Sequence, residues 1–147
     1  KGLLWFFVYE RALDSSYRLS PIDLYENRTE TFERLARQNK IFKDHFSSRL
    51  AGATLDRVTH FNKSYGRTET YAEGSFADFE ISTTYGNPLI LSKFHDEEGE
   101  FVLIVNNSQN NSERVRGSLE RVAFDEWLAP GQMKLLKYGE NGARERL

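Results

Sequence analysis

The chain has 147 residues, 39% of them hydrophobic and 14% aromatic, which is enough for the core of one ordinary domain or of a small domain with an attached piece. Its 20 basic and 22 acidic residues give a formal net charge of −2 without a basic cluster, so nucleic acid and an anionic membrane surface are disfavoured as partners. The absence of cysteine excludes disulfides, thiolate metal sites and a cysteine nucleophile.

Residues 2–9 form an unbroken apolar run rich in tryptophan, phenylalanine and valine. Such a run predicts a strand buried on both faces, and it is too short to span a bilayer. The following residues, 10–26, contain turn and cap formers without any period, and a loop of that length in a compact domain is usually functional. Because the chain opens on Lys1 and enters the strand after one glycine, we expect it to be a fragment or a processed piece of something longer.

A helix is predicted over about residues 28–51. Asn27 is expected to cap it, with Glu30 three residues later. Apolar side chains then recur at helical spacing from Phe32 to Leu50, and Gly52 ends the pattern.

After Gly52 the apolar period changes from helical to alternating, and we place a domain boundary there. Strands are predicted at residues 54–60, 75–84, 89–94, 101–105, 115–122 and 133–138, with room for a short edge strand at 68–71. The turn at 96–99 makes the third and fourth of these a hairpin. Residues 101–105 are apolar at every position, so both faces of that strand should be covered. Residues 123–128 are expected to form a connection that carries Phe124 and Trp127.

Short strands at roughly ten-residue spacing predict a mainly β fold, an antiparallel β-sandwich at residues 53–138. A strand–loop–helix segment at 1–52 precedes it and looks like the last βα unit of a different domain. Residues 139–147 are charged, contain two glycines and are expected to be a flexible tail.

Three phrases stand out in this order of elements: S-P-I-D-x-Y-x-N-R-T at 20–29, N-K-I-F at 39–42 and L-A-P-G-Q-M-K-L-L at 128–136. With them, the chain resembles the C-terminal end of a TIM-barrel glycoside hydrolase, namely the eighth strand and helix of the barrel followed by the β-sandwich that many such enzymes carry. The resemblance implies that the two catalytic carboxylates lie on barrel strands outside these residues. It also implies a chain that is inactive alone, a secreted or periplasmic location, no cofactor, and as partners carbohydrate and a catalytic barrel in the same polypeptide.

Under this resemblance, the chain contributes to the rim of the substrate site through four residues at or after the end of the first strand: Trp5, Tyr9, Glu10 and Asp14. Aromatic rings stack on the apolar face of a sugar, and carboxylates accept hydrogen bonds from its hydroxyls. The alternative is that Trp5 and Tyr9 are core residues and that Glu10 pairs with a nearby arginine, Arg11 or Arg18.

Two other functions remain open. The chain could be a stand-alone carbohydrate-binding or adhesion β-sandwich with an aromatic platform formed by Tyr65, Tyr71, Phe76 and Tyr85, although packing is the more common fate of strand aromatics. It could instead be an interaction module for a partner other than carbohydrate, with residues 3–9 as a docking strand.

The histidines and the glycosylation sequons are two further groups of candidate site residues. The three histidines, His45, His60 and His95, are scattered, and we expect no metal site from them. Four sequons begin at Asn27, Asn62, Asn106 and Asn110, and each is explained as well by a cap or turn as by glycosylation.

Overall fold

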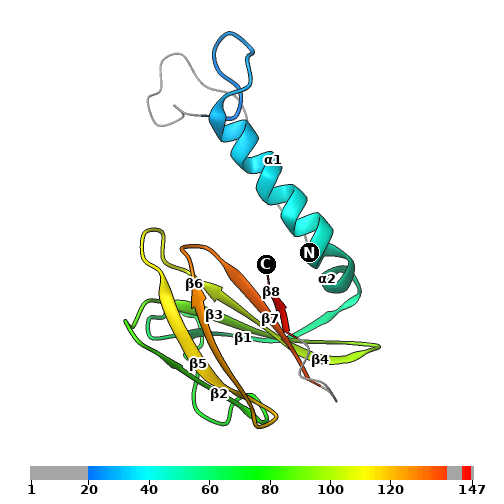
Figure 1. Cartoon of the computed structure of the whole chain (residues 1–147), viewed down its shortest axis with the longest axis vertical. Coiled ribbons are helices and arrows are strands. Elements are labelled where there is room, and N and C mark those ends of the chain that lie inside the picture. The colour runs from blue at the N-terminus through cyan, green and yellow to red at the C-terminus, as the bar shows by residue number, and fades with distance from the viewer. Residues whose placement is uncertain (1–19, 139–143, 147) are drawn as a thin grey trace. The chain divides into compact units, whose positions relative to one another are not determined.

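The computed structural model describes residues 20–138 and 144–146. It divides the chain into two compact units, Lys1–Gly52 and Ala53–Leu147 (Figure 1). The strand predicted at residues 2–9 and most of the loop after it lie outside the described residues.

The first unit contains one long helix. It consists of α1 (Glu30–Phe42), a π-helical turn η2 (Lys43–Ser47) and α2 (Ser48–Gly52), which follow one another without a gap. Phe46 is buried, and its ring stacks on that of Phe42 with 6.0 Å between centroids. The predicted amphipathic helix is therefore present.

The N-cap of this helix is Thr29, so the prediction that Asn27 caps it is wrong. The side chain of Asp23 accepts hydrogen bonds from the backbone N–H groups of Tyr25 and Asn27, both over 2.8 Å, which draws Asn27 into a turn that precedes the helix. The carbonyl oxygen of Thr29 accepts the first helical hydrogen bond, from Phe32 over 3.0 Å.

The second unit is a sandwich of two antiparallel sheets, as predicted (Figure 1). The larger sheet has the strand order β1 (Thr54–Phe61), β3 (Leu89–Asp96), β4 (Gly99–Asn106), β7 (Met133–Lys137) and β8 (Arg144–Arg146). The smaller sheet has the order β2 (Phe79–Thr83), β5 (Glu113–Leu119) and β6 (Val122–Leu128). The short strand β8 lies within the segment that we expected to be a flexible tail.

The predicted hairpin is formed by β3 and β4, whose register runs from Asp96 opposite Gly99 to Leu89 opposite Asn106. Gly99 has φ of 129°, a conformation that side chains with a Cβ rarely adopt. Strand β4 is the middle strand of its sheet, and its residues from Phe101 to Ile104 are all buried. The prediction that both faces of this strand are covered is confirmed.

Strand β6 occupies the segment that we expected to be a connection. Phe124 and Leu128 are buried while Trp127 is half exposed, which is the alternation of a strand. The turn into β6 uses Glu120 and Arg121 with φ of 50° and 66°. Because this turn contains no glycine, the usual sequence signal for a hairpin was missing.

The connection between β1 and β2 contains less regular secondary structure than the sequence predicts. The short edge strand predicted at 68–71 is reduced to one parallel bridge between His60 and Thr70. The carbonyl oxygen of His60 accepts a hydrogen bond from the N–H of Tyr71 over 2.8 Å. The next strand, β2, starts at Phe79 and is shorter than the predicted strand at 75–84.

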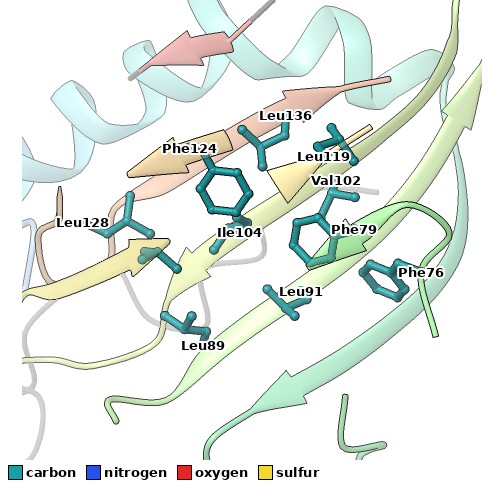
Figure 2. Packing of buried hydrophobic residues seen from close by; sticks show 11 residues of the cluster. Phe76, Phe79, Leu89, Leu91, Val102, Ile104, Leu119, Phe124, Leu128 and Leu136 are labelled. Carbon is teal, nitrogen blue, oxygen red and sulfur yellow. The ribbon is translucent and has the colours of Figure 1, made fainter. Parts of the chain in front are cut away.

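The core of the sandwich lies between the two sheets (Figure 2). Phe79 of β2 stacks on Phe124 of β6 with 6.2 Å between centroids. Gly117 lies so close to β2 that a Cβ at this position would be 1.9 Å from the carbonyl oxygen of Glu80. An ion pair between Lys134 of β7 and Glu126 of β6, both largely shielded from solvent, links the two sheets.

The larger sheet also has apolar side chains on the side turned away from the smaller sheet, because side chains alternate along its strands. We call this side the second apolar face, and it comprises Val58, Ile90, Phe94, Phe101, Leu103, Val105, Met133 and Leu135. Phe94 and Phe101 lie opposite each other in the register and stack with 5.2 Å between centroids and 10° between ring planes. Both sides of this sheet are therefore hydrophobic.

Candidate functional site

The four residues predicted to contact substrate, Trp5, Tyr9, Glu10 and Asp14, lie outside the described residues, as does the docking strand proposed at 3–9. Their role stays a prediction. Within the part of the chain that the structure describes, two features of the sandwich have the chemistry of a binding site.

The first feature is the solvent side of the smaller sheet, which we call the outer face. Strand pairing and alternation place a mainly polar set of side chains there: Glu80, Ser82, Thr84, Arg114, Arg116, Ser118, Ala123, Asp125 and Trp127. The side chains of the same strands that point inward, such as Val115 and Phe124, belong to the core.

Two large aromatic residues lie exposed at one end of the outer face. Tyr85 follows β2 and is 62% exposed, while Trp127 of β6 is 49% exposed. Their ring centroids are 5.7 Å apart and the ring planes are tilted by 37°, so the two rings form one continuous apolar surface in solvent. We call them the Tyr85–Trp127 pair.

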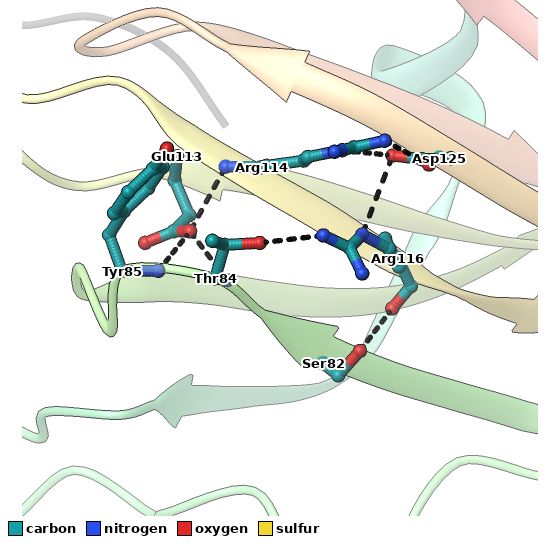
Figure 3. Close-up of polar contacts among 7 residues, drawn as sticks. All are labelled: Ser82, Thr84, Tyr85, Glu113, Arg114, Arg116 and Asp125. Atoms are coloured by element: carbon teal, nitrogen blue, oxygen red, sulfur yellow. Dashed lines mark hydrogen bonds and ion pairs between the residues drawn. The ribbon is translucent and has the colours of Figure 1, made fainter.

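The backbone beneath Tyr85 is held by the carboxylate of Glu113, a fully buried residue at the start of β5 (Figure 3). One carboxylate oxygen accepts hydrogen bonds from the N–H groups of Thr84 and Tyr85, each over 2.9 Å, and from that of Arg114 over 3.0 Å. The other oxygen accepts one from the N–H of Asn87 over 2.8 Å. The loop that carries Tyr85 is thus held by three backbone hydrogen bonds to the side chain of Glu113, and the fourth comes from Arg114 in β5 itself.

These hydrogen bonds also decide the charge of Glu113. Burial alone raises the pKa of a carboxyl group, but the four backbone N–H donors favour the carboxylate and bring the pKa of Glu113 below its ordinary value. Glu113 is therefore ionised at neutral pH.

A group of charged side chains lies beside the aromatic pair on the outer face. The guanidinium group of Arg114 donates two hydrogen bonds to the carboxylate of Asp125, over 2.8 and 2.7 Å. Arg116 lies 3.8 Å from the same carboxylate and donates to the hydroxyl of Thr84 over 3.1 Å. The hydrogen bond from Arg114 lowers the pKa of Asp125, so this carboxylate stays ionised and offsets the charge of its neighbours.

The second feature is a cleft of about 430 Å³ beside β2, lined by Phe61, Tyr71, Glu73, Glu80, Ile81, Ser82 and Gly117. The hydroxyl of Tyr71 donates to the carbonyl oxygen of Phe79 over 2.9 Å. Burial, followed by the negative charges of Glu73 and Glu80, raises the pKa of Tyr71. The cleft brings together two carboxylates and two aromatic rings.

The aromatic platform that the alternative function required, formed by Tyr65, Tyr71, Phe76 and Tyr85, is divided by the fold, and part of it packs into the core. Phe76 and Tyr71 pack edge to face with 5.6 Å between centroids, and Phe76 is buried in the core. Tyr85 is exposed, but the ring beside it is that of Trp127. The prediction missed Trp127 because its segment was assigned to a connection.

The histidines are also apart in the structure. His60 is buried and packs against the ring of Tyr65, whereas Nδ1 of His95 lies 2.6 Å from a carboxylate oxygen of Asp56. The described residues contain no group of three side chains suited to holding a metal ion. None of the described helices combines the length and the hydropathy needed to cross a membrane.

One of the four sequons begins at a buried asparagine. Asn106 is fully buried, and its side-chain amide donates hydrogen bonds to the carbonyl oxygens of Asn111 and Leu128, both over 2.9 Å. An asparagine in this position is not accessible to a glycan in the folded protein.

Comparison of the chain with protein-family models, with curated proteins and with solved structures found no match. The structure by itself identifies a small mainly β domain with two antiparallel sheets, preceded by one helix.

Proposed function

We propose that this chain is the C-terminal part of a glycoside hydrolase, in which the β-sandwich is a structural module and the segment before it completes the rim of the substrate site. The catalytic carboxylates would lie on a barrel in the remainder of the same polypeptide. The order of elements supports the proposal, since a helix directly precedes an antiparallel sandwich whose last long strand, β7, follows the A-P-G-Q turn.

The observation that carries the proposal is the second apolar face. A sheet in a two-layer sandwich needs one apolar side, and the other side is ordinarily polar because it faces water. Here the far side of the larger sheet has Leu103 and Leu135 at adjacent positions of neighbouring strands, beside the stacked pair of Phe94 and Phe101. Phe101 and Leu135 on this face are buried within the chain, at 0% and 1% exposure. A sandwich sheet that is apolar on both sides and covered on both sides supports a module that packs within a larger architecture.

In this proposal the chain alone does not hydrolyse glycosides, because both known mechanisms need two carboxyl groups at a fixed separation across the bond. Several acids of the sandwich already hold structure together: Glu113 binds backbone N–H groups, and Asp125 and Glu126 are in ion pairs. Glu73 and Glu80 line the cleft, so an assay has to test whether this pair of carboxyl groups hydrolyses a glycoside.

The experiment is a hydrolysis assay on a panel of aryl glycosides and polysaccharides, with the chain alone and with the longer polypeptide to which it belongs. We expect turnover by the longer polypeptide only, and Glu10→Gln in that polypeptide should mainly raise KM. Turnover by the isolated chain that disappears in Glu73→Gln or Glu80→Gln would contradict the proposal, as would a longer polypeptide that cleaves no glycoside.

A further inference from the structure

We infer that the outer face of the smaller sheet binds an uncharged polysaccharide built of pyranose units, with the Tyr85–Trp127 pair as its stacking surface. This inference goes beyond the proposed function, because it requires neither a catalytic barrel nor hydrolysis. It rests on three properties of the outer face: exposed apolar area, a fixed backbone and balanced charge.

Exposure is the first property. Tyr85 and Trp127 keep 62% and 49% of their surface in solvent although they lie in contact with each other. Other aromatic side chains of the sandwich, such as Phe79 and Phe124, are inside the core. A contiguous pair of exposed rings on a mainly polar sheet face is typical of a surface that is covered by a ligand.

The fixed backbone is the second property. Trp127 lies near the end of the paired strand β6, opposite Arg114, and the buried carboxylate of Glu113 accepts a hydrogen bond from the N–H of Tyr85. Since both rings project from a backbone that is held by hydrogen bonds of the sandwich itself, little conformational entropy is lost at that backbone on binding.

Balanced charge is the third property and identifies the class of ligand. The outer face has two cationic side chains, Arg114 and Arg116, and two acidic ones, Glu80 and Asp125, and Asp125 pairs with both arginines. Their formal charges cancel, so the face offers no net attraction to a polyanion. An uncharged ligand with many hydroxyl groups fits, because a hydroxyl can both accept from guanidinium groups and donate to carboxylates.

The aromatic pair complements the same ligand. One side of a pyranose ring presents C–H groups, whose partial positive charge matches the negative face of a tyrosine or tryptophan ring. Hydroxyl groups at the edge of the sugar then lie toward the polar side chains of the sheet. Two adjacent exposed rings at the end of the sheet face can stack on more than one sugar unit, which suits a chain of sugars better than a compact small molecule.

The test is affinity electrophoresis of the full chain through gels that contain soluble starch, xylan, laminarin or hydroxyethylcellulose, with heparin as a polyanion for comparison. We expect at least one neutral polysaccharide to retard the wild-type chain. Trp127→Ala and Tyr85→Ala should each weaken that retardation by about tenfold or more in apparent Kd, and Trp127→Phe should keep part of it. Both positions are on the surface, and a thermal melt of each variant checks that it is folded.

Tyr25→Ala is the matched control, because Tyr25 is 82% exposed but belongs to the first unit. It should bind as the wild type does. The inference is overturned if no neutral polysaccharide retards the chain, if heparin alone does, or if folded Trp127→Ala and Tyr85→Ala variants bind normally. Retardation that depends on this pair, in a protein whose longer form cleaves no glycoside, would refute the proposed function and leave the binding site standing.

Discussion

The carboxylate of Glu113, which is completely buried, accepts a hydrogen bond over 2.9 Å from the backbone N–H of Tyr85, whose own ring is largely in solvent. One inward-pointing acid thus determines where an exposed aromatic side chain is presented. The same carboxylate binds three further backbone N–H groups, those of Thr84, Asn87 and Arg114. The core and the outer face of the smaller sheet are coupled through this residue.

Glu113→Gln should lower the free energy of unfolding at neutral pH by about 1–3 kcal/mol, because an amide has only one acceptor oxygen and places an N–H₂ group against backbone donors. Urea denaturation of the two proteins measures the difference. Glu97→Gln, in the exposed turn between β3 and β4, is the control and should change little. A Glu113→Gln variant as stable as the wild type would mean that the three hydrogen bonds from Thr84, Tyr85 and Asn87 do not hold the loop.

At acidic pH the protein should lose the stability that the ionised carboxylate of Glu113 contributes. Its pKa in the folded protein is lower than 4.5, the ordinary value of a glutamate, so the ionised carboxylate stabilises the fold at every pH above about 4.5. This stability is lost as the pH falls from that value through the lowered pKa. Urea denaturation as a function of pH should therefore show the wild type and Glu113→Gln converging below about pH 4.5. A constant difference down to strong acid would contradict this assignment.

Leu103→Ala should cost about 2–5 kcal/mol of stability, since Leu103 is 8% exposed in the middle strand of the larger sheet. Leu55→Ala removes the same atoms from a side chain that is 46% exposed on β1 and should cost much less. Denaturant melts of both variants give the comparison. A loss below about 1 kcal/mol at Leu103 would show that the second apolar face is not covered in solution.

Gly117→Ala should destabilise the sandwich strongly. A Cβ would lie 1.9 Å from the carbonyl oxygen of Glu80 and 2.8 Å from the ring of Phe124, so the pairing of β2 and β5 would have to shift. We expect a loss of about 1–3 kcal/mol or more. Gly52→Ala is the matched control: nothing lies within 4 Å of its Cβ position, and alanine favours a helix, so its melting temperature should be unchanged or higher.

Limited proteolysis should cut the helix before it cuts the sandwich. Trypsin has exposed sites in α1 at Arg34, Arg37 and Lys40, whereas the strands of the sandwich are held by two sheets and a common core. We expect mass spectrometry to find a stable product that begins near Ala53 or a few residues before it. Digestion that proceeds evenly from both ends would argue against a sandwich that folds independently.

Much of the fold can be predicted from residues that are close together in the chain. The uninterrupted apolar run that includes Phe101 and Ile104 predicts a strand covered on both sides, and Gly99 after a polar turn predicts the hairpin, because both depend on residues close together in the chain. The long helix was likewise predictable from its apolar period. The residue that caps the helix was not predictable in this way. The carboxylate of Asp23 accepts a hydrogen bond from the N–H of Asn27 and places Asn27 in a turn before the helix, which the spacing of apolar residues does not indicate.

Strand β6 and the outer face depended on long-range pairing. Glu120 and Arg121 adopt positive φ angles in the turn before β6, a conformation in which glycine or asparagine is usual. The sequence therefore lacks the residues that normally predict a hairpin, and the strand that carries Trp127 was not predicted. Tyr85 and Trp127 are distant in the chain and meet only because β5 lies between β2 and β6. Likewise, Glu113 becomes a binding group for the loop at 84–87 only once the register places that loop over it.

The spacing of apolar residues along short segments is enough to predict the class of fold and the hairpin at the centre of the larger sheet. Three properties become visible only in the folded chain: which acid is buried, which aromatic rings are exposed together, and that the larger sheet is apolar on both sides. Those properties depend on strand order and register, and many sequences with the same local pattern would bring other side chains together.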